Sequence, residues 1–250
     1  MDLKNIIKKI TPNFLLEFRK RQIARSTLSK QVSSLSMSQT HQDYWVYGEV
    51  YNEKKNGYFL DVGAYDGVYL SNTFILEKRY GWKGICIEAN PSLVGLLERN
   101  RSSICVNACV DSLEGEEEFA LDGIFGGIVA EGNLFHSEEK RNVIKVKTIP
   151  LVNILEENRA PSVIDYMSID IEGAEERALM GFPFDKYIFN CITIERPTCQ
   201  RNELLNVSGY LLIKEIPGHD CFYIHKDFEA QYMQNMFAFS NKKFSFRRWM

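Results

Sequence analysis

The sequence predicts an α/β domain with a mostly parallel sheet, helices on both faces and an antiparallel closing strand pair. Three observations predict this fold class. Short apolar runs alternate with helical stretches from residue 57 onward, the first run leads into a glycine-bearing turn, and acidic residues end several of the runs. The chain has 250 residues, which is enough for one such domain with extensions and short for two.

Each element follows from a local pattern. Apolar runs bounded by glycine or charge are typical of buried parallel strands, and the longer stretches between them are typical of covering helices. We predict strands at 58–62, 84–88, 104–110, 143–148, 164–170 and 190–195. The predicted closing pair is 210–216 with 221–224. Helices are predicted at 71–80, 91–100, 150–158 and 174–180.

The two ends differ from the domain between them. Residues 1–30 hold eight Lys or Arg and two Asp or Glu, and Leu3, Ile6, Ile7 and Ile10 follow helical spacing. The predicted division is a basic amphipathic helical extension at 1–35, a domain at 36–230 and a C-terminal tail at 231–250. The extension can pack on its own domain, pair with a second chain in a homodimer, or lie on an anionic membrane surface. The first two interpretations are favoured.

Composition narrows the functional class. The formal net charge of -3 argues against a surface made for polyanions such as nucleic acid. We find no signal-peptide pattern and no run of 18 apolar residues. The six cysteines include no CxxC pair, which is typical of small core residues in a reducing compartment. We therefore expect a cytoplasmic protein that does not bind nucleic acid.

The turn after the first predicted strand contains Asp61, Gly63, Asp66 and Gly67. Glycine keeps a turn tight and lets backbone approach a ligand, and a nucleotide-like ligand can lie there, near the start of the next helix. Neither GxGxxG nor a GKS or GKT phosphate loop occurs, so a ligand without a pyrophosphate fits better and an NAD enzyme is disfavoured. Taken alone, the motif is equally compatible with a plain strand-to-helix turn.

Glu88 ends the second predicted strand, 27 residues after Asp61. An acidic side chain at that position can accept hydrogen bonds from both ribose hydroxyls of a nucleoside. Such charge-assisted bonds contribute about 1.5–3 kcal/mol each. With the glycine turn upstream, this interpretation is favoured over a merely solvated strand end.

Carboxylates also end the strands predicted at 164–170 and 190–195. Asp170 and Glu172 follow the first, and Glu195 ends the second. Ligands of this architecture bind at that edge of the sheet, so Asp170 with Glu195 could form an acid/base pair or hold a divalent cation. The alternative is a carboxylate that only bonds loop backbone. Glu175 is interpreted as a favourable charge at the start of the next helix.

Together these motifs resemble the FkbM family of methyltransferases. The resemblance covers roughly residues 36–225 and rests on several motifs in the right order, among them GYFLDVGAYDG at 57–67, GWKGICIEANP at 81–91 and IDYMSIDIEGAE at 164–175. The family usually has proline where this chain has Ala89. The acidic residue before that position and the Asn-Pro after it are intact.

The resemblance implies a Rossmann-like class I methyltransferase that transfers a methyl group from S-adenosylmethionine, usually to a hydroxyl of a sugar or small metabolite. Glu88 would hold the ribose, Ser71 and Asn72 would lie near the amino-acid end of the cofactor, and Asn107 and Ala108 near the adenine. The full implied cofactor set is Asp61, Gly63, Ala64, Asp66, Gly67, Ser71, Asn72, Glu88, Asn107, Ala108 and Asp170.

The acceptor hydroxyl must lose a proton, and a positioned base contributes roughly 10²–10⁴-fold to the rate of such a step. Asp170 is the leading candidate, with Glu172, Glu195 and His136 as rivals. The glycine-rich stretch 123–132 is expected to be a mobile substrate loop or lid, since it is too rich in glycine for a regular element. The alternative is a plain exposed connection.

Two other classes compete with this hypothesis. A non-catalytic protein could keep the fold and bind a nucleoside or a partner, although intact Gly63, Glu88 and Asp170 argue against decay of the site. A nucleic-acid methyltransferase is disfavoured by the acidic body and by the absence of an Asn-Pro-Pro-Tyr base-flipping motif.

Overall fold

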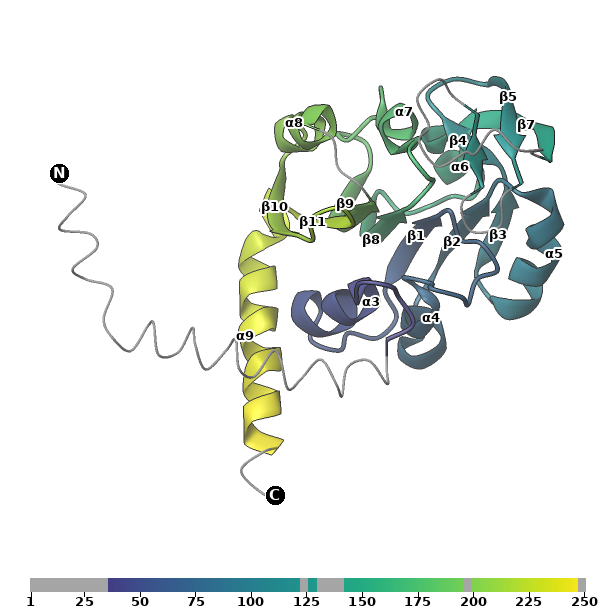
Figure 1. Cartoon of the computed structure of the whole chain (residues 1–250). Helices are drawn as coiled ribbons and strands as arrows, with labels where there is room; N and C mark the ends of the chain where they lie inside the picture. The colour runs from purple at the N-terminus through teal and green to yellow at the C-terminus, as the bar shows by residue number, and fades with distance from the viewer. Residues whose placement is uncertain (1–35, 122–125, 130–141, 196–198, 247–250) are drawn as a thin grey trace. The chain divides into compact units, whose positions relative to one another are not determined.

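The computed structural model of the protein describes residues 36–121, 126–129, 142–195 and 199–246. Its centre is a seven-stranded sheet with the order β10-β11-β9-β8-β1-β2-β3 (Figure 1). The strands are β1 (Tyr58–Val62), β2 (Lys83–Glu88), β3 (Ile104–Asn107), β8 (Val163–Ile169), β9 (Ile188–Glu195), β10 (Tyr210–Glu215) and β11 (Asp220–His225). The predicted extension at 1–35 lies outside the described residues.

The pairing of these strands confirms the predicted fold class. From β3 through β2, β1 and β8 to β9 all neighbours are parallel, whereas β11 runs antiparallel to both β9 and β10. The sheet grows from β1 toward β3 and then resumes on the other side with β8, so the strand order reverses at β1. Open sheets of this kind bind ligands beyond the carboxyl ends of their strands at such a switch point.

A second, four-stranded sheet was not predicted. Its order is β4-β7-β5-β6, and its strands are β4 (Cys109–Asp111), β5 (Gly115–Ala120), β6 (Gly127–Ile128) and β7 (Val143–Pro150). The strand predicted at 104–110 is therefore wrong as a single element, because the chain changes sheet at Ala108. The Ala108 N–H donates to the Glu88 carbonyl, 3.1 Å, and the next residue begins β4.

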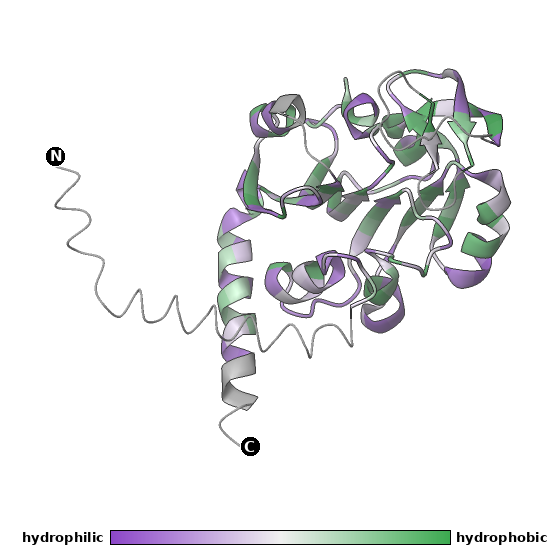
Figure 2. Ribbon diagram, viewed as in Figure 1, coloured by the Kyte–Doolittle hydropathy of each residue, from purple (hydrophilic) through white to green (hydrophobic). Residues whose placement is uncertain are grey.

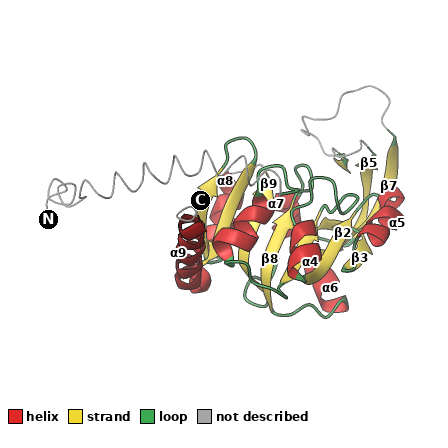
Figure 3. Ribbon diagram, turned by 90° about the horizontal axis from the view of Figure 1, so that it is seen from below, coloured by secondary structure: helices red, strands yellow, loops and turns green. Residues whose placement is uncertain are grey.

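The same sheet corrects part of the lid prediction. Within the glycine-rich stretch, Ile128 of β6 pairs with Phe119 of β5, so a regular strand forms there. Residues 122–125 and 130–141, with His136, lie outside the described residues. Figure 3 shows β5 and β7 at the same end of the row of strands as α5.

Helices cover the central sheet on both sides, with α3, η1 and α4 on one side and α6, α7 and α8 on the other (Figure 1). Asn90 caps α5 by accepting from the Ser92 N–H, 3.0 Å, and Pro91 occupies the first helical position. The helices are α3 (Gln42–Tyr44), η1 (Trp45–Val50, π-helical), α4 (Phe74–Tyr80), α5 (Pro91–Asn100), α6 (Leu151–Glu157), α7 (Glu175–Leu179), α8 (Cys199–Val207), η3 (Lys226–Phe228, 3₁₀) and α9 (Glu229–Phe246).

The core lies between the sheet and these helices. Strand residues such as Leu60, Ile85, Met167 and Ile192 are fully buried in one continuous cluster. Figure 2 shows the central strands as mainly hydrophobic and the outer helices as mixed. Burial on both faces explains why these strands read as continuous apolar runs in the sequence.

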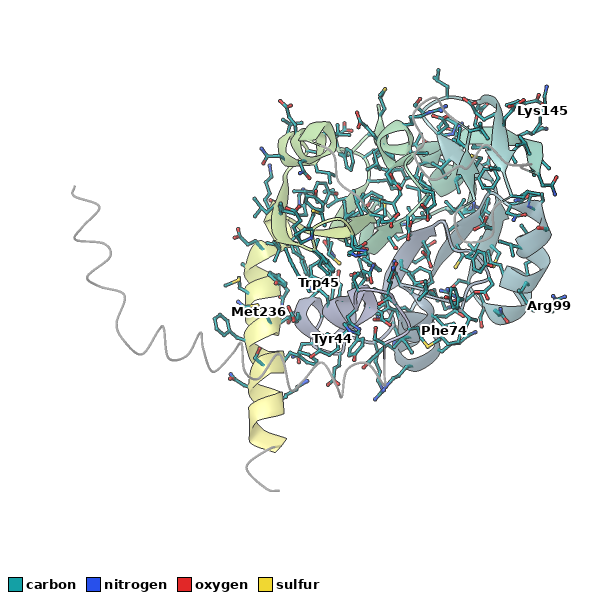
Figure 4. All side chains as sticks on the ribbon, viewed as in Figure 1. Tyr44, Trp45, Phe74, Arg99, Lys145 and Met236 are labelled. Carbon is teal, nitrogen blue, oxygen red and sulfur yellow. The ribbon has the colours of Figure 1, made fainter. Side chains whose placement is uncertain are left out.

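The C-terminal segment differs from the predicted tail. Residues 229–246 form one helix, α9, so the predicted boundary at 230 falls inside a regular element. Tyr232 and Phe239 on this helix are buried against Trp45 and Tyr44 respectively. Figure 4 shows Trp45 and Tyr44 on the part of the domain next to α9. This aromatic packing makes α9 part of the domain. In the described part of the chain, no helix is long and apolar enough to span a membrane.

Candidate active site

A cavity of about 600 Å³, partly open to solvent, lies at the carboxyl ends of the central strands. The central sheet contributes Gly63, Glu88 and Asp170 to its wall. The second sheet contributes Cys109, Phe119 and Ile128. The cavity therefore lies at the switch point of the strand order, where this architecture binds its ligands.

The glycine turn brings three strand ends together. The N–H groups of Gly63 and Ala64 both donate to the carbonyl of Ile87 at the end of β2, 3.0 Å each. Gly63 has φ of 89°, and a Cβ placed on it would lie 1.8 Å from the carbonyl oxygen of Asp170. No side chain fits at this position, so the sequence must have glycine for β1 and β8 to approach this closely.

Glu88 lies at the end of β2 with its carboxylate held in a fixed position. Its Oε2 accepts from the Tyr65 N–H and its Oε1 from the Asn90 N–H, both 2.8 Å. Burial raises the pKa of this carboxyl, and these two N–H groups act in the opposite direction. Each carboxylate oxygen can accept more than one hydrogen bond, so acceptor capacity remains for a ligand.

The other residues implied for the cofactor divide into two groups. Ala108 lines the cavity beside Glu88, and Asn107 supports that wall by donating from Nδ2 to the Glu88 carbonyl, 2.8 Å. The rest lie outside the cavity wall, on or behind the turn: Asp61, Ala64, Asp66, Gly67, Ser71 and Asn72. Several of these make hydrogen bonds that hold the turn, which the sequence could not distinguish from ligand contacts.

Asp66 and Asn72 illustrate such supporting contacts. Asp66 Oδ1 accepts from the N–H groups of Val68 and Tyr69 at 2.8 and 2.7 Å, closing a local turn. Asn72 Nδ2 donates to Ser168 Oγ on β8, 2.9 Å. Both side chains therefore shape the loop between β1 and α4.

The structure brings the predicted carboxylates of β8 and β9 together. Asp170 and Glu195 offer carboxyl oxygens within 4.8 Å of each other, and the charge of Glu195 helps to raise the pKa of Asp170. Glu175 joins them, since the three groups each offer an oxygen and these oxygens lie within 4.8 Å of one another. Burial, together with the charges of Glu195, Glu172 and Glu175, holds the pKa of Asp170 well above its usual range.

The rival bases occupy different places. Glu172 lines the cavity next to Gly126 with a left-handed backbone, φ 54°. His136 lies outside the described residues.

Sequence reasoning missed the buried position of Glu175. It is 1% exposed, and its Oε1 accepts from the N–H groups of Ile171 and Gly173, 3.1 Å each. The predicted role of a charge at a helix start accounts for only part of this, because the carboxylate also closes the loop that follows β8. Tyr65, Asn90 and Phe119, which line the cavity, were also missed.

A strand-order reversal, a glycine turn, an acidic residue ending β2 and a cavity across them define a Rossmann-like domain with a site for a nucleotide-like ligand. A family model described as the methyltransferase FkbM domain matches residues 61–204, more than half of the chain. The chain belongs to this family. No curated protein matches the sequence.

Three solved structures are similar to the chain at low sequence identity and with TM-scores below 0.5. The METTL16 methyltransferase domain has 10% identity and a TM-score of 0.44; the match covers 73% of this chain and 65% of that one, just under two thirds. Precorrin-6y C5,15-methyltransferase from Geobacter metallireducens GS-15 has 12% identity and a TM-score of 0.39, and the match covers 76% of this chain and 89% of that one. A TehB-like SAM-dependent methyltransferase from Corynebacterium glutamicum ATCC 13032 has 11% identity and a TM-score of 0.40, and the match covers 72% of this chain and 88% of that one.

Proposed function

We propose that the protein transfers the methyl group of S-adenosylmethionine to a hydroxyl oxygen of a sugar, glycan or small metabolite, and does not act on nucleic acid. The observation that carries this proposal is the Asp170–Glu195 carboxyl pair, whose oxygens lie within 4.8 Å of each other and whose Asp170 lines the cavity directly beside Gly63. A hydroxyl acceptor needs a group that takes its proton, and this pair offers one next to the turn implied for the cofactor.

The residues present fit the cofactor. Gly63 leaves backbone free of a side chain, the Glu88 carboxylate is fixed by two N–H groups, and Ala108 leaves an apolar wall beside it. We assign Glu88 to the ribose hydroxyls and the Ala108 wall to the adenine. When bound, the cofactor supplies an electrophilic methyl carbon, so the protein has to align the acceptor oxygen with it and remove the proton.

Asp170 is proposed as the group that accepts the proton. A base works best when its pKa lies near the working pH, and burial among carboxylates moves the pKa of Asp170 upward from that of an ordinary aspartate. Glu195 would share the proton, and Glu172, on the cavity wall, is the nearest alternative base. His136 stays a candidate from the sequence.

A divalent cation is the alternative occupant of the carboxylate cluster, which is compact enough to hold one. The two N–H groups that donate to Glu175 Oε1 already use part of its acceptor capacity, which favours a proton held among the carboxyls instead. We therefore expect turnover to survive EDTA. Activity lost on chelation and restored by Mg²⁺ would establish the cation.

Calorimetric titration with S-adenosylhomocysteine tests the cofactor assignment. Wild type should bind in the micromolar range, and Glu88→Ala should lose at least tenfold in affinity, because two ribose hydrogen bonds of about 1.5–3 kcal/mol each disappear. Glu98→Ala, an exposed glutamate on α5, is the matched control and should bind as wild type does. Well-folded wild type without affinity would favour a non-catalytic protein that keeps the fold.

The acceptor class is tested separately. Purified protein is incubated with labelled S-adenosylmethionine and panels of free sugars, glycans, hydroxylated metabolites and RNA. Transfer to a hydroxyl is expected. Methylation of RNA alone, or of a nitrogen atom, would contradict the proposed acceptor.

A further inference from the structure

We propose that Arg101 is a positioning residue for the cofactor. It holds the 63–73 loop, which connects β1 to α4, in the shape that binds S-adenosylmethionine, although it is not part of the cavity wall. This inference rests on the proposed placement of the cofactor.

Arg101 lies directly after α5 and its side chain is 0% exposed. The guanidinium reaches across the whole loop. NH1 donates to the Gly67 carbonyl at 3.2 Å and to Ser71 Oγ at 3.4 Å, and NH2 donates to Thr73 Oγ1 at 2.8 Å. The planar fork therefore binds the middle and the end of the loop together.

Two carboxylates fix the guanidinium in turn. Arg101 Nε donates to Glu77 Oε2 on α4, 2.9 Å, and NH1 lies 3.8 Å from Asp61 Oδ2 on β1. Thr73 connects these groups, since its hydroxyl accepts from Arg101 and donates to Asp61. A buried cation thus joins the strand before the loop, the loop itself and the helix after it.

The loop needs this support because its backbone is unusual. Gly63, Tyr65, Gly67 and Leu70 all have positive φ, at 89°, 51°, 80° and 54°. Left-handed backbone costs about 1–3 kcal/mol at a residue other than glycine and persists only where the surroundings impose it. At Gly67 the surroundings are Arg101 itself, since a Cβ there would lie 2.7 Å from Arg101 Cγ.

The loop then acts on the proposed ribose ligand. Tyr65, one of the left-handed residues, donates its N–H to Glu88 Oε2. Asn100, the neighbour of Arg101, donates from Nδ2 to the Asp66 carbonyl, 2.8 Å, and holds the adjacent residue. Loss of the guanidinium should therefore free the Tyr65 N–H and let the Glu88 carboxylate move, although no cavity-lining residue is substituted.

Arg101→Lys tests this inference, because lysine keeps the positive charge and loses the fork. The matched control is Tyr210→Phe, which removes the hydroxyl that accepts from the Phe189 N–H in the core at the far end of the sheet. Affinity for S-adenosylhomocysteine is measured by calorimetry at a temperature where each variant is folded. Amide hydrogen exchange at Tyr65 and Asn90 is measured in parallel.

We expect Arg101→Lys to bind at least tenfold more weakly than wild type and to exchange both amides faster. Tyr210→Phe should bind within twofold of wild type, even if its midpoint of thermal unfolding falls by as much as that of Arg101→Lys. A purely structural role would lower the midpoints of both variants and leave both affinities unchanged, which overturns the inference. Where Arg101→Lys does not fold, Thr73→Val decides, since it removes only the bridging hydroxyl and should weaken binding several-fold.

The two proposals fail in different ways. Wild type that does not bind S-adenosylhomocysteine overturns the proposed cofactor site and the inference with it. Wild type that binds, beside a folded Arg101→Lys that binds equally well, overturns the inference alone.

Discussion

One group of carboxylates surrounds a buried cation, whereas a second group, at the carboxyl ends of β8 and β9, contains only carboxylates. Asp61 and Glu77 surround the Arg101 guanidinium, whereas Asp170, Glu175 and Glu195 face one another. Although burial acts against it, hydrogen bonds from Ser103, Lys78 and Ser102 and the charge of Arg101 lower the pKa of Glu77 to about 2. Burial and neighbouring carboxylates move the pKa of Asp170 the other way.

The difference shows how one residue type serves two purposes. A carboxylate that stays charged beside a fixed cation holds the backbone in shape, and one that is surrounded by other carboxylates has a raised pKa and can take up a proton more readily. Asp61 is intermediate, because burial outweighs the attraction of Arg101 and raises its pKa. We therefore propose that the first group supports cofactor binding and the second takes part in proton transfer.

The largest effect is expected from Asp170→Asn. If the second group takes the proton, this substitution should lower turnover by roughly 10²–10⁴-fold. In wild type, turnover should rise with pH through an apparent pKa well above 4, and this rise should vanish in the variant. Asp185→Asn, an exposed aspartate after α7, is the control. Turnover within a few-fold of wild type would remove Asp170 as the base.

The next largest effect is expected on the free energy of unfolding, which should differ between variants of the two carboxylate groups. Glu77→Gln leaves the buried Arg101 with only Asp61, and breaking such a pair costs about 3–5 kcal/mol. Glu195→Gln removes a like charge beside Asp170 and should change the free energy of unfolding by less than about 1 kcal/mol. Urea unfolding at pH 7.5 measures both, with the exposed Glu156→Gln as control. Equal losses of unfolding free energy in Glu77→Gln and Glu195→Gln would contradict the proposed difference between the two groups.

The pH dependence of stability tests the same difference between the two carboxylate groups. The folded-state pKa of Glu77 is lowered from 4.5 to about 2, so its stabilisation is present above pH 4.5 and lost as the pH falls toward 2. The pKa of Asp170 is raised from 3.8, so its contribution is present at low pH and lost as the pH rises. The stability difference between wild type and Glu77→Gln should therefore be constant above about pH 5.5 and shrink in acid. A constant difference down to pH 3 would contradict the lowered pKa.

The smallest effect is expected at the opposite edge of the sheet. There Lys54 Nζ lies 2.7 Å from Asp165 Oδ1, but its side chain is 40% exposed. Lys54→Met should cost only about 0.2–1 kcal/mol, because water screens the pair. If Lys54→Met lost as much free energy of unfolding as Glu77→Gln in the same urea experiment, the large effect at Arg101 would come from ion pairing rather than from burial.

The sequence predicted the parts of the fold that depend on local pattern. The parallel strands, the closing pair and the turn at Gly63 follow from apolar runs and glycine, and the structure contains them. The change of sheet at Ala108 was not predictable, since residues 104–110 read as one apolar run. Arg101 and Glu175 look like ordinary charges near helix ends, and only the packing of distant elements buries them.

The second sheet has a consequence for how such proteins diversify. It comes from one contiguous stretch, 109–150, and Cys109 pairs with Thr148, so the chain enters and leaves at neighbouring positions. A segment that begins and ends at neighbouring positions can be replaced without disturbing β1 and β2. Because it supplies Phe119 and Ile128 to the cavity, substitutions confined to this stretch would change the cavity wall while β1 and β2, which lead into the glycine turn and end in Glu88, stay as they are.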